Sequence, residues 1–128
     1  LPDDMEEHVM MCFVRLAEMS PGRIADRLLP KLRRGVLLVT GKSSEDWESY
    51  GGRPLWFADG PNSLLADDLA DPIQNELDYL IDTQTDDGSW QPPWSWGQYD
   101  QEWEPAKVEW AGWLTLKNLL ALKARNRI

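Results

Sequence analysis

The stretch TQTDDGSWQPPWSWGQYDQEW, residues 83–103, contains four of the eight tryptophans of the chain. It is interrupted by Gly88, by the pair Pro92–Pro93 and by Gly97. Because such residues end helices and favour turns, the stretch predicts an ordered loop. Helical patterns lie on both sides of it, so the fold depends on the helices that this loop connects.

The segments that flank the loop repeat apolar residues with the spacing of a helix. Before it, Asp71 and Pro72 form a typical helix start. The apolar stripe of this helix is predicted to consist of Ile73, Leu77, Leu80 and Ile81. After the loop, a last helix is expected from about Pro105 to about Arg125, apolar on more than one side. We therefore expect this helix to be buried against several neighbours.

Two further helices are predicted nearer the N-terminus. One is expected from a cap at Asp4 to Met19, and its apolar face would consist of Met5, Val9, Cys12, Phe13 and Leu16. The other is expected to end near Gly41, with a kink or a division at Pro30. Residues 42–70 lack the pattern and predict a long ordered loop with a turn of helix. Since no segment alternates with the period of a strand, the predicted fold class is all-α.

Composition narrows the possible partners and the compartment. The chain has 128 residues, a net charge of −9 and a single cysteine. The acidic balance argues against nucleic acid or an anionic membrane as the main partner, because both attract clustered basic residues. One cysteine permits no intrachain disulfide and fits a cytoplasmic protein. No apolar run is long enough for a transmembrane segment.

The run from Tyr79 to Trp90 resembles the QW repeat of squalene–hopene cyclases and related terpenoid cyclases, with Gln84, Gly88 and Trp90 in the named positions. The sequence that follows resembles the C-terminal end of bacterial proteins with prenyltransferase and squalene-oxidase repeats. This resemblance implies a partial α/α toroid of helical hairpins with long ordered loops, similar to terpenoid cyclases and protein prenyltransferases. It also implies that residues 1–128 form a single helical domain, the C-terminal half of a longer toroid.

A structural role is expected for the three residues of the repeat. Gly88 permits the positive φ of a sharp reversal after a helix. The Gln84 amide can satisfy free backbone groups, and the Trp90 ring can cover an apolar seam between helices.

An aromatic cavity for an apolar small molecule is the functional alternative to this structural interpretation. Aromatic faces stabilise cations, and acids beside them can donate a proton if they are desolvated. The candidate catalytic acids are Asp59, Glu102 and Glu109. The candidate ligand-lining residues are Trp94, Trp96, Tyr99, Trp103 and Trp56.

The string DDLAD contains the candidate metal ligands Asp67, Asp68 and Asp71. It matches the DDxxD motif with which some terpenoid cyclases bind Mg²⁺ and a diphosphate. However, Asp71 is better explained as a cap before Pro72, which places the motif across a helix start. The DxDD acid of alkene-protonating cyclases does not occur. We expect no metal and no other cofactor.

Two functions remain. The first is a helical module that binds an apolar partner chain or completes a toroid, as a homodimer or with a complementary N-terminal half, and is not catalytic alone. In this case Trp110, Trp113 and Leu120 are expected near the buried seam. The alternative is a cyclase-type enzyme, or half of one, that acts on an isoprenoid-like apolar molecule in an aromatic cavity.

Overall fold

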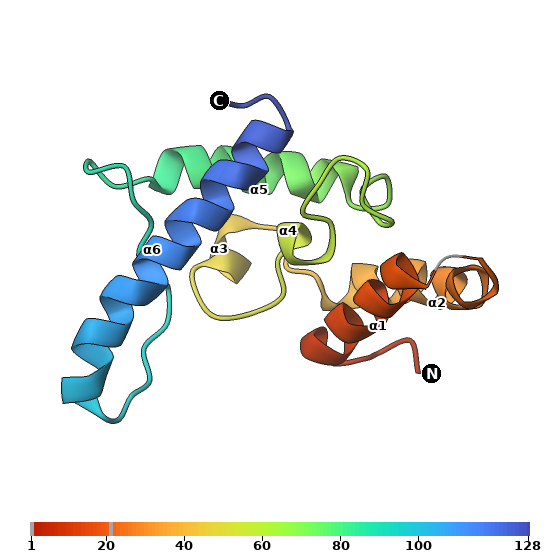
Figure 1. Cartoon of the computed structure of the whole chain (residues 1–128), viewed down its shortest axis with the longest axis horizontal. Coiled ribbons are helices and arrows are strands. Elements are labelled where there is room, and N and C mark those ends of the chain that lie inside the picture. Colours follow the sequence, from red (N-terminus) through yellow and green to blue (C-terminus); the bar gives the residue numbers. More distant parts are fainter. Residues whose placement is uncertain (1, 21) are drawn as a thin grey trace.

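The computed structural model describes residues 2–20 and 22–128, and every regular element in these ranges is a helix. The predicted all-α class is therefore confirmed. In Figure 1 the short helix α4 lies at the centre, with the hairpin of α1 and α2 on one side, α6 on the other and α5 running across above it. Their bounds are α1 Glu7–Met19, α2 Arg23–Val39, α3 Ser44–Trp47, α4 Pro54–Phe57, α5 Ala70–Thr83 and α6 Asp100–Ala124.

The α1–α2 hairpin begins later than predicted and buries a different face. Glu6, and not Asp4, is the N-cap of α1; its side chain accepts a hydrogen bond from the Val9 amide. The buried residues of α1 are Met10, Val14 and Ala17, whereas the predicted face is half exposed at Val9 and Leu16. Apolar residues occur on both sides of this helix, so periodicity alone could not select the face that packs.

A close approach between the two helices decides which face of α1 is buried. Gly35 of α2 lies so near α1 that a Cβ atom there would come within 2.5 Å of the Met10 methyl carbon. Met10, Leu32 and Val36 are fully buried around this point. Pro30 lies inside α2, which the structure describes as one continuous element from Arg23 to Val39.

The region predicted as a long loop contains two single-turn helices, α3 and α4. Pro54 occupies the first turn of α4, where its missing N–H is not needed. Leu55 and Phe57 are buried between α1 and α5. The expected turn of helix is thus confirmed, and a second one was not foreseen.

Helix α5 buries most of its predicted stripe. Ile73, Leu77 and Leu80 are at most 2% exposed, while Ile81 is 43% exposed. The predicted cap at Asp71 is wrong, because the helix begins at Ala70 with Leu69 as the N-cap and no side-chain cap bond. The Leu69 carbonyl accepts a hydrogen bond from the Ile73 amide at 2.8 Å, so the first turn of the helix already contains Asp71 and Pro72.

Helix α6 is longer and less buried than predicted. It begins at Asp100, five residues before Pro105, since Tyr99 adopts a left-handed conformation (φ 57°) and accepts a bond from the Trp103 amide at 2.8 Å. The expectation that it is buried on several sides is wrong for the single chain. One side remains uncovered, and we call the apolar residues along it the α6 strip: Trp110, Trp113, Leu116 and Leu120, which are 38, 50, 60 and 58% exposed.

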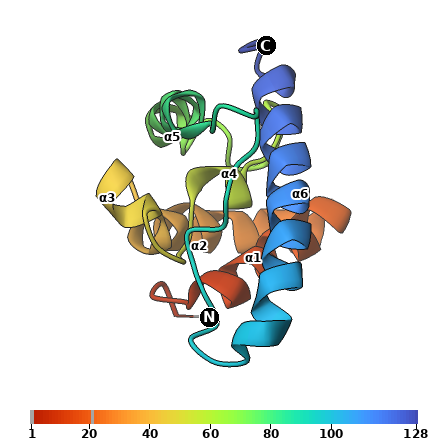
Figure 2. The same ribbon diagram turned by 90° about the vertical axis from the view of Figure 1, so that its left-hand side faces the viewer.

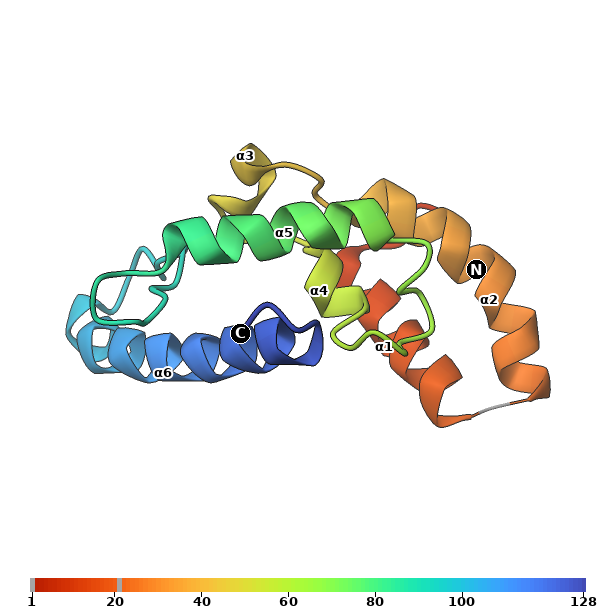
Figure 3. The ribbon, with the colours of Figure 1, turned by 90° about the horizontal axis from the view of Figure 1, so that it is seen from above.

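The C-terminal half of α6 is held over α4 and α5 by two arginines. Arg125 donates hydrogen bonds to the backbone oxygens of Ala58 (2.8 Å) and Asp59 (2.7 Å) at the end of α4. Arg127 pairs with Asp78 of α5. The N-terminal half of α6 projects away from α5, and the segment leading into it runs alongside (Figures 1 and 2). Seen from above, α6 forms one edge of the molecule, with α5 beside it (Figure 3).

Candidate functional site

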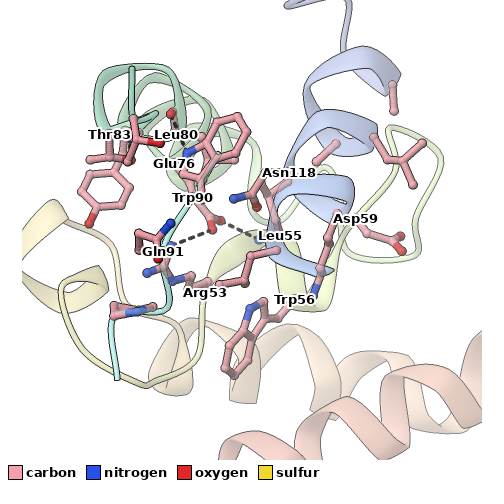
Figure 4. A pocket seen from close by; sticks show the side chains of 18 of the residues that line it. Arg53, Leu55, Trp56, Asp59, Glu76, Leu80, Thr83, Trp90, Gln91 and Asn118 are labelled. Atoms are coloured by element: carbon pink, nitrogen blue, oxygen red, sulfur yellow. Dashed lines mark hydrogen bonds and ion pairs between the residues drawn. The ribbon is translucent and has the colours of Figure 1, made fainter. Parts of the chain in front are cut away.

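A cavity of about 540 Å³ lies between α4, α5, α6 and the segment from Thr85 to Trp94. Its walls combine aromatic and aliphatic side chains with a few polar ones, and Figure 4 shows them from close by. This size is within the range of small-molecule sites in proteins. The aromatic lining residues are Trp56, Tyr79, Trp90 and Trp94, and the charged ones are Arg53, Asp59, Glu76 and Lys117.

The turn from Gln84 to Trp90 builds one wall of this cavity. Gly88 has a φ of 85°, and the Gln84 side-chain amide donates a hydrogen bond to the Gly88 carbonyl at 2.8 Å. The Trp90 ring is 5% exposed and donates from Nε1 to the Leu80 carbonyl at 2.9 Å. Gly88 has the positive φ that was expected, and the Gln84 amide bonds a backbone oxygen of its own turn; the structural role of the repeat stays a prediction. The Trp90 ring closes the space between α5 and α6.

Glu76 is the most unusual residue of the site. Its side chain is almost completely buried, although glutamates are rarely buried without full pairing. It accepts a hydrogen bond from the Leu55 amide at 2.8 Å, and one Arg53 nitrogen lies 4.0 Å from its other oxygen (Figure 4). Desolvation by burial raises the pKa of Glu76 from 4.5 to about 7, against the lowering effect of the Leu55 amide and of Arg53. Its carboxyl group is therefore partly protonated at neutral pH.

Sequence reasoning missed Glu76, although the sequence contained a signal. Glu76 lies three residues after Ile73, just before Leu77 and four before Leu80, so it occupies the apolar face of α5. A charged residue within such a stripe indicates a buried ionisable group. That observation would have identified the position, but not its partners from α4.

Lys117 of α6 is the second unusual charged group of the cavity. Its ammonium lies 5.7 Å from the ring centre of Trp56 and 4.8 Å from that of Trp113. Desolvation lowers the pKa of Lys117, and the charges of Glu76 and Asp59 partly oppose this effect. The ammonium is thus held by aromatic faces.

The predicted aromatic residues separate into two groups. Trp56 and Trp94 line the cavity. Tyr50 is not among the lining residues but contacts both rings, with its ring centre 5.5 Å from that of Trp56 and 5.7 Å from that of Trp94. Trp96 and Trp103 pack against each other at the start of α6, with their ring centres 5.1 Å apart and their planes tilted by 46°, and neither lines the cavity.

Tyr99 precedes α6 and is 66% exposed. It is outside the cavity lining as well, so the structure brings two of the five predicted ligand-lining residues to the cavity.

The predicted catalytic acids are not brought together. Asp59 lines the rim of the cavity, where it is exposed and accepts a hydrogen bond from Ser63 at 3.2 Å. Glu102 and Glu109 are exposed on the N-terminal half of α6 and do not line the cavity. The acid that does lie inside is Glu76.

The three candidate metal ligands are also separated by their local structure. Asp68 forms an ion pair with Arg33 of α2, with 3.3 Å between Oδ1 and Nε. Asp67 is exposed in the turns before α5, and Asp71 is exposed in the first turn of that helix. In the described parts of the chain, the acidic and histidine side chains close enough to share one ion lie at the start of α1 and not here.

Comparison of the chain with protein-family models, with curated proteins and with solved structures finds no match. Within residues 2–20 and 22–128, no helix is both long and apolar enough to span a membrane. The functional interpretation therefore depends on the cavity and on the α6 strip.

Proposed function

We propose that this chain is a helical module that binds an apolar helical surface of another chain through the α6 strip. The observation that carries this assignment is the exposure of Trp113, Leu116 and Leu120, each half exposed or more. Removing apolar surface from water contributes roughly 25 cal/mol per Å², so a contiguous uncovered strip favours association.

The total surface of the chain supports the same assignment. The accessible surface is 8050 Å², whereas a compact monomer of 14.7 kDa exposes about 6,900 Å². The excess of about 1,100 Å² is comparable to the area of about 800 Å² that one partner buries in a specific interface of standard size.

A second copy of α6 fits the strip in both shape and charge. In an antiparallel pair centred on Leu116, positions at equal distances from Leu116 lie opposite each other. Leu120 then faces Gly112 of the copy, where an added Cβ would meet nothing within 4 Å. Glu109 faces Lys123 of the copy, which places opposite charges across the interface twice. With 3.6 residues per turn, all these positions lie on one side of the helix.

A partial α/α toroid is the architecture that we propose for this module. The QW-like turn joins α5 to α6, and α1 with α2 forms a separate hairpin. A complementary chain that completes the ring would bind the same strip as a second copy does. In a solution of the purified chain the only available partner is another copy of the same chain, so self-association is the first test.

Sedimentation velocity at micromolar concentration is expected to detect a dimer. Leu116→Asp places two carboxylates at the twofold axis and is expected to raise the dissociation constant at least tenfold. Leu38→Asp on α2, where the leucine is 68% exposed, is the matched control and should leave the dimer intact.

Charge reversal tests the antiparallel register. Glu109→Lys and Lys123→Glu should each weaken the dimer, and the double variant should restore it. A monomer that binds no apolar dye, or a dimer indifferent to Leu116→Asp, would contradict the assignment to the α6 strip.

Glu76 favours a second candidate function, a cyclase-type enzyme acting on an isoprenoid-like molecule. A carboxyl group with a pKa of about 7 in an aromatic cavity can hold a proton for transfer to a substrate. Turnover of an isoprenoid alcohol that is lost in Glu76→Gln, with an unchanged far-UV spectrum, would support this candidate. Absence of any product from the parent chain would count against it.

A further inference from the structure

Within residues 2–20 and 22–128, the Lys117 ammonium forms no ion pair. It lines the cavity from the middle of α6, and its contacts are the faces of Trp56 and Trp113. Among the described residues, no carboxylate oxygen lies within 4.0 Å of it, and no hydrogen-bond acceptor contacts it. A half-buried ammonium with unused donors is unfavourable, because part of its hydration has been lost without replacement.

The other cation of the cavity is already occupied. Arg53 donates a hydrogen bond to the Trp47 carbonyl, lies over the Tyr79 ring at 5.6 Å, and lies close to Glu76. Its guanidinium therefore has partners on several sides. Lys117 is the lining cation whose donors remain available to a ligand.

A further donor lies next to Lys117 in the sequence. The Asn118 side chain lines the cavity (Figure 4). In the part of the chain that the structure describes, its amide makes no hydrogen bond. One turn of α6 thus presents an ammonium and an amide to the same space.

The rest of the cavity is suited to an apolar body. Trp56 and Trp90 enter it from opposite sides in Figure 4, and Leu55, Leu80 and Leu114 complete the walls. The Trp90 wall is rigid, because its amide donates to the Thr115 hydroxyl at 3.1 Å and its ring donates to Leu80. A preformed apolar wall lowers the entropy that a ligand loses on binding.

We propose that this cavity binds an apolar carboxylate. The carboxylate group accepts hydrogen bonds from the Lys117 ammonium, with the Asn118 amide as a further donor, and the hydrocarbon lies against Trp56, Trp90 and Trp94. Charge-assisted hydrogen bonds of this kind are stronger than neutral ones.

The charges of the lining favour a monoanion over a phosphate. Lys117 supplies one uncommitted positive charge, and Arg53 is shared with Glu76. Asp59 at the rim and the ionised fraction of Glu76 would both repel a dianion more strongly than a monoanion. A single carboxylate matches the single available ammonium. Aliphatic and ring-bearing carboxylates share this chemistry, so the test includes one of each.

Isothermal titration calorimetry with chain-matched probes tests the charge requirement. Decanoate and naphthoate supply the carboxylate on an aliphatic and on a ring body, and decanol supplies the same chain as decanoate without the charge. The concentrations are kept below micelle formation. We expect decanoate to bind at least tenfold more tightly than decanol, with a change in tryptophan emission because three tryptophans line the cavity.

Variants of α6 assign the preference to Lys117. Lys117→Met keeps an unbranched apolar stem and removes the charge, so decanoate should lose its advantage while decanol binding stays. Lys117→Arg should retain the preference. Lys107→Met, at an exposed position outside the cavity, is the matched control and should behave like the parent. Retained decanol binding shows that the cavity is intact in each variant.

Three outcomes would overturn this assignment. The first is that neither carboxylate binds at millimolar concentration. The second is that decanol binds as tightly as decanoate to the parent chain. The third is that Lys117→Met keeps the preference for decanoate, because the anion would then be bound elsewhere.

Discussion

Replacing the buried Glu76 with glutamine is expected to remove a pH-dependent loss of stability. In the folded chain the pKa of Glu76 is about 7, raised from 4.5 by burial. A group with a raised pKa binds its proton more tightly in the folded state, so its stabilising effect is full below pH 4.5. That effect is lost as the pH rises towards 7 and beyond. One pKa unit corresponds to about 1.4 kcal/mol, so the whole shift corresponds to about 3 kcal/mol.

Glutamine has nearly the shape of protonated glutamate and can still accept the hydrogen bond from the Leu55 amide. We therefore expect Glu76→Gln to have similar stability to the parent at pH 5 and to be more stable by about 2–3 kcal/mol at pH 8. The Glu76 carboxylate is weakly attracted to Arg53, which lies 4.0 Å away. This attraction needs no separate correction, because the pKa of about 7 already includes it.

Urea unfolding of both chains, followed at 222 nm from pH 5 to pH 8, measures this difference. Taking the difference between the two chains cancels groups that titrate identically in both, such as the exposed His8, whose pKa is raised by Glu6. Glu76→Leu serves as a control that removes the titratable group and also the acceptor of the hydrogen bond from the Leu55 amide. A stability difference between Glu76→Gln and the parent that stays constant across this range would refute the reasoning.

The remaining predictions concern the turn between α5 and α6. Trp90→Ala should lower the free energy of unfolding by about 3–5 kcal/mol, because the ring is 5% exposed. Thermal and urea melts would measure this loss, and a variant that melts like the parent would show that the ring is dispensable. Gly88→Val should lower the free energy of unfolding by about 1–3 kcal/mol, because Gly88 has a φ of 85° and a β-branched residue is strained in that conformation. Gly51→Val, at a glycine with open space and no positive φ, is the matched control and should melt nearly like the parent.

Much of the helical content could be predicted from the sequence, because it depends on local spacing. The stripe of Ile73, Leu77 and Leu80 has a single apolar face, and the structure buries that face. The buried face of helix α1 was harder to predict, since Met10 and Val14 form an apolar face on one side and Val9 and Leu16 form another. Only the position of α2, which packs through Gly35, decides between them, and this information is not local.

The candidate site was less predictable because its polar contacts join distant parts of the chain. The Leu55 amide that Glu76 contacts comes from α4, and the aromatic partner Trp56 of Lys117 comes from the same helix. The sequence does show which residues are aromatic, but not which of them share a cavity. Trp56 and Trp94 do so, whereas Trp96 forms a separate pair with Trp103.

Three features of this chain are unfavourable for the stability of the folded monomer, and they lie close together. Glu76 is ionisable and buried, Lys117 is a half-buried cation held by two rings, and Leu120 is an exposed apolar residue at the rim of the same cavity. A chain with apolar residues in place of Glu76 and Lys117, and a polar residue in place of Leu120, would be at least as stable. Departures from the usual rules of stability tend to coincide with functional sites. Because Trp113 belongs to the α6 strip and also contacts Lys117, the strip and the cavity form one continuous surface region. This arrangement favours a functional origin for all three features over a purely structural one.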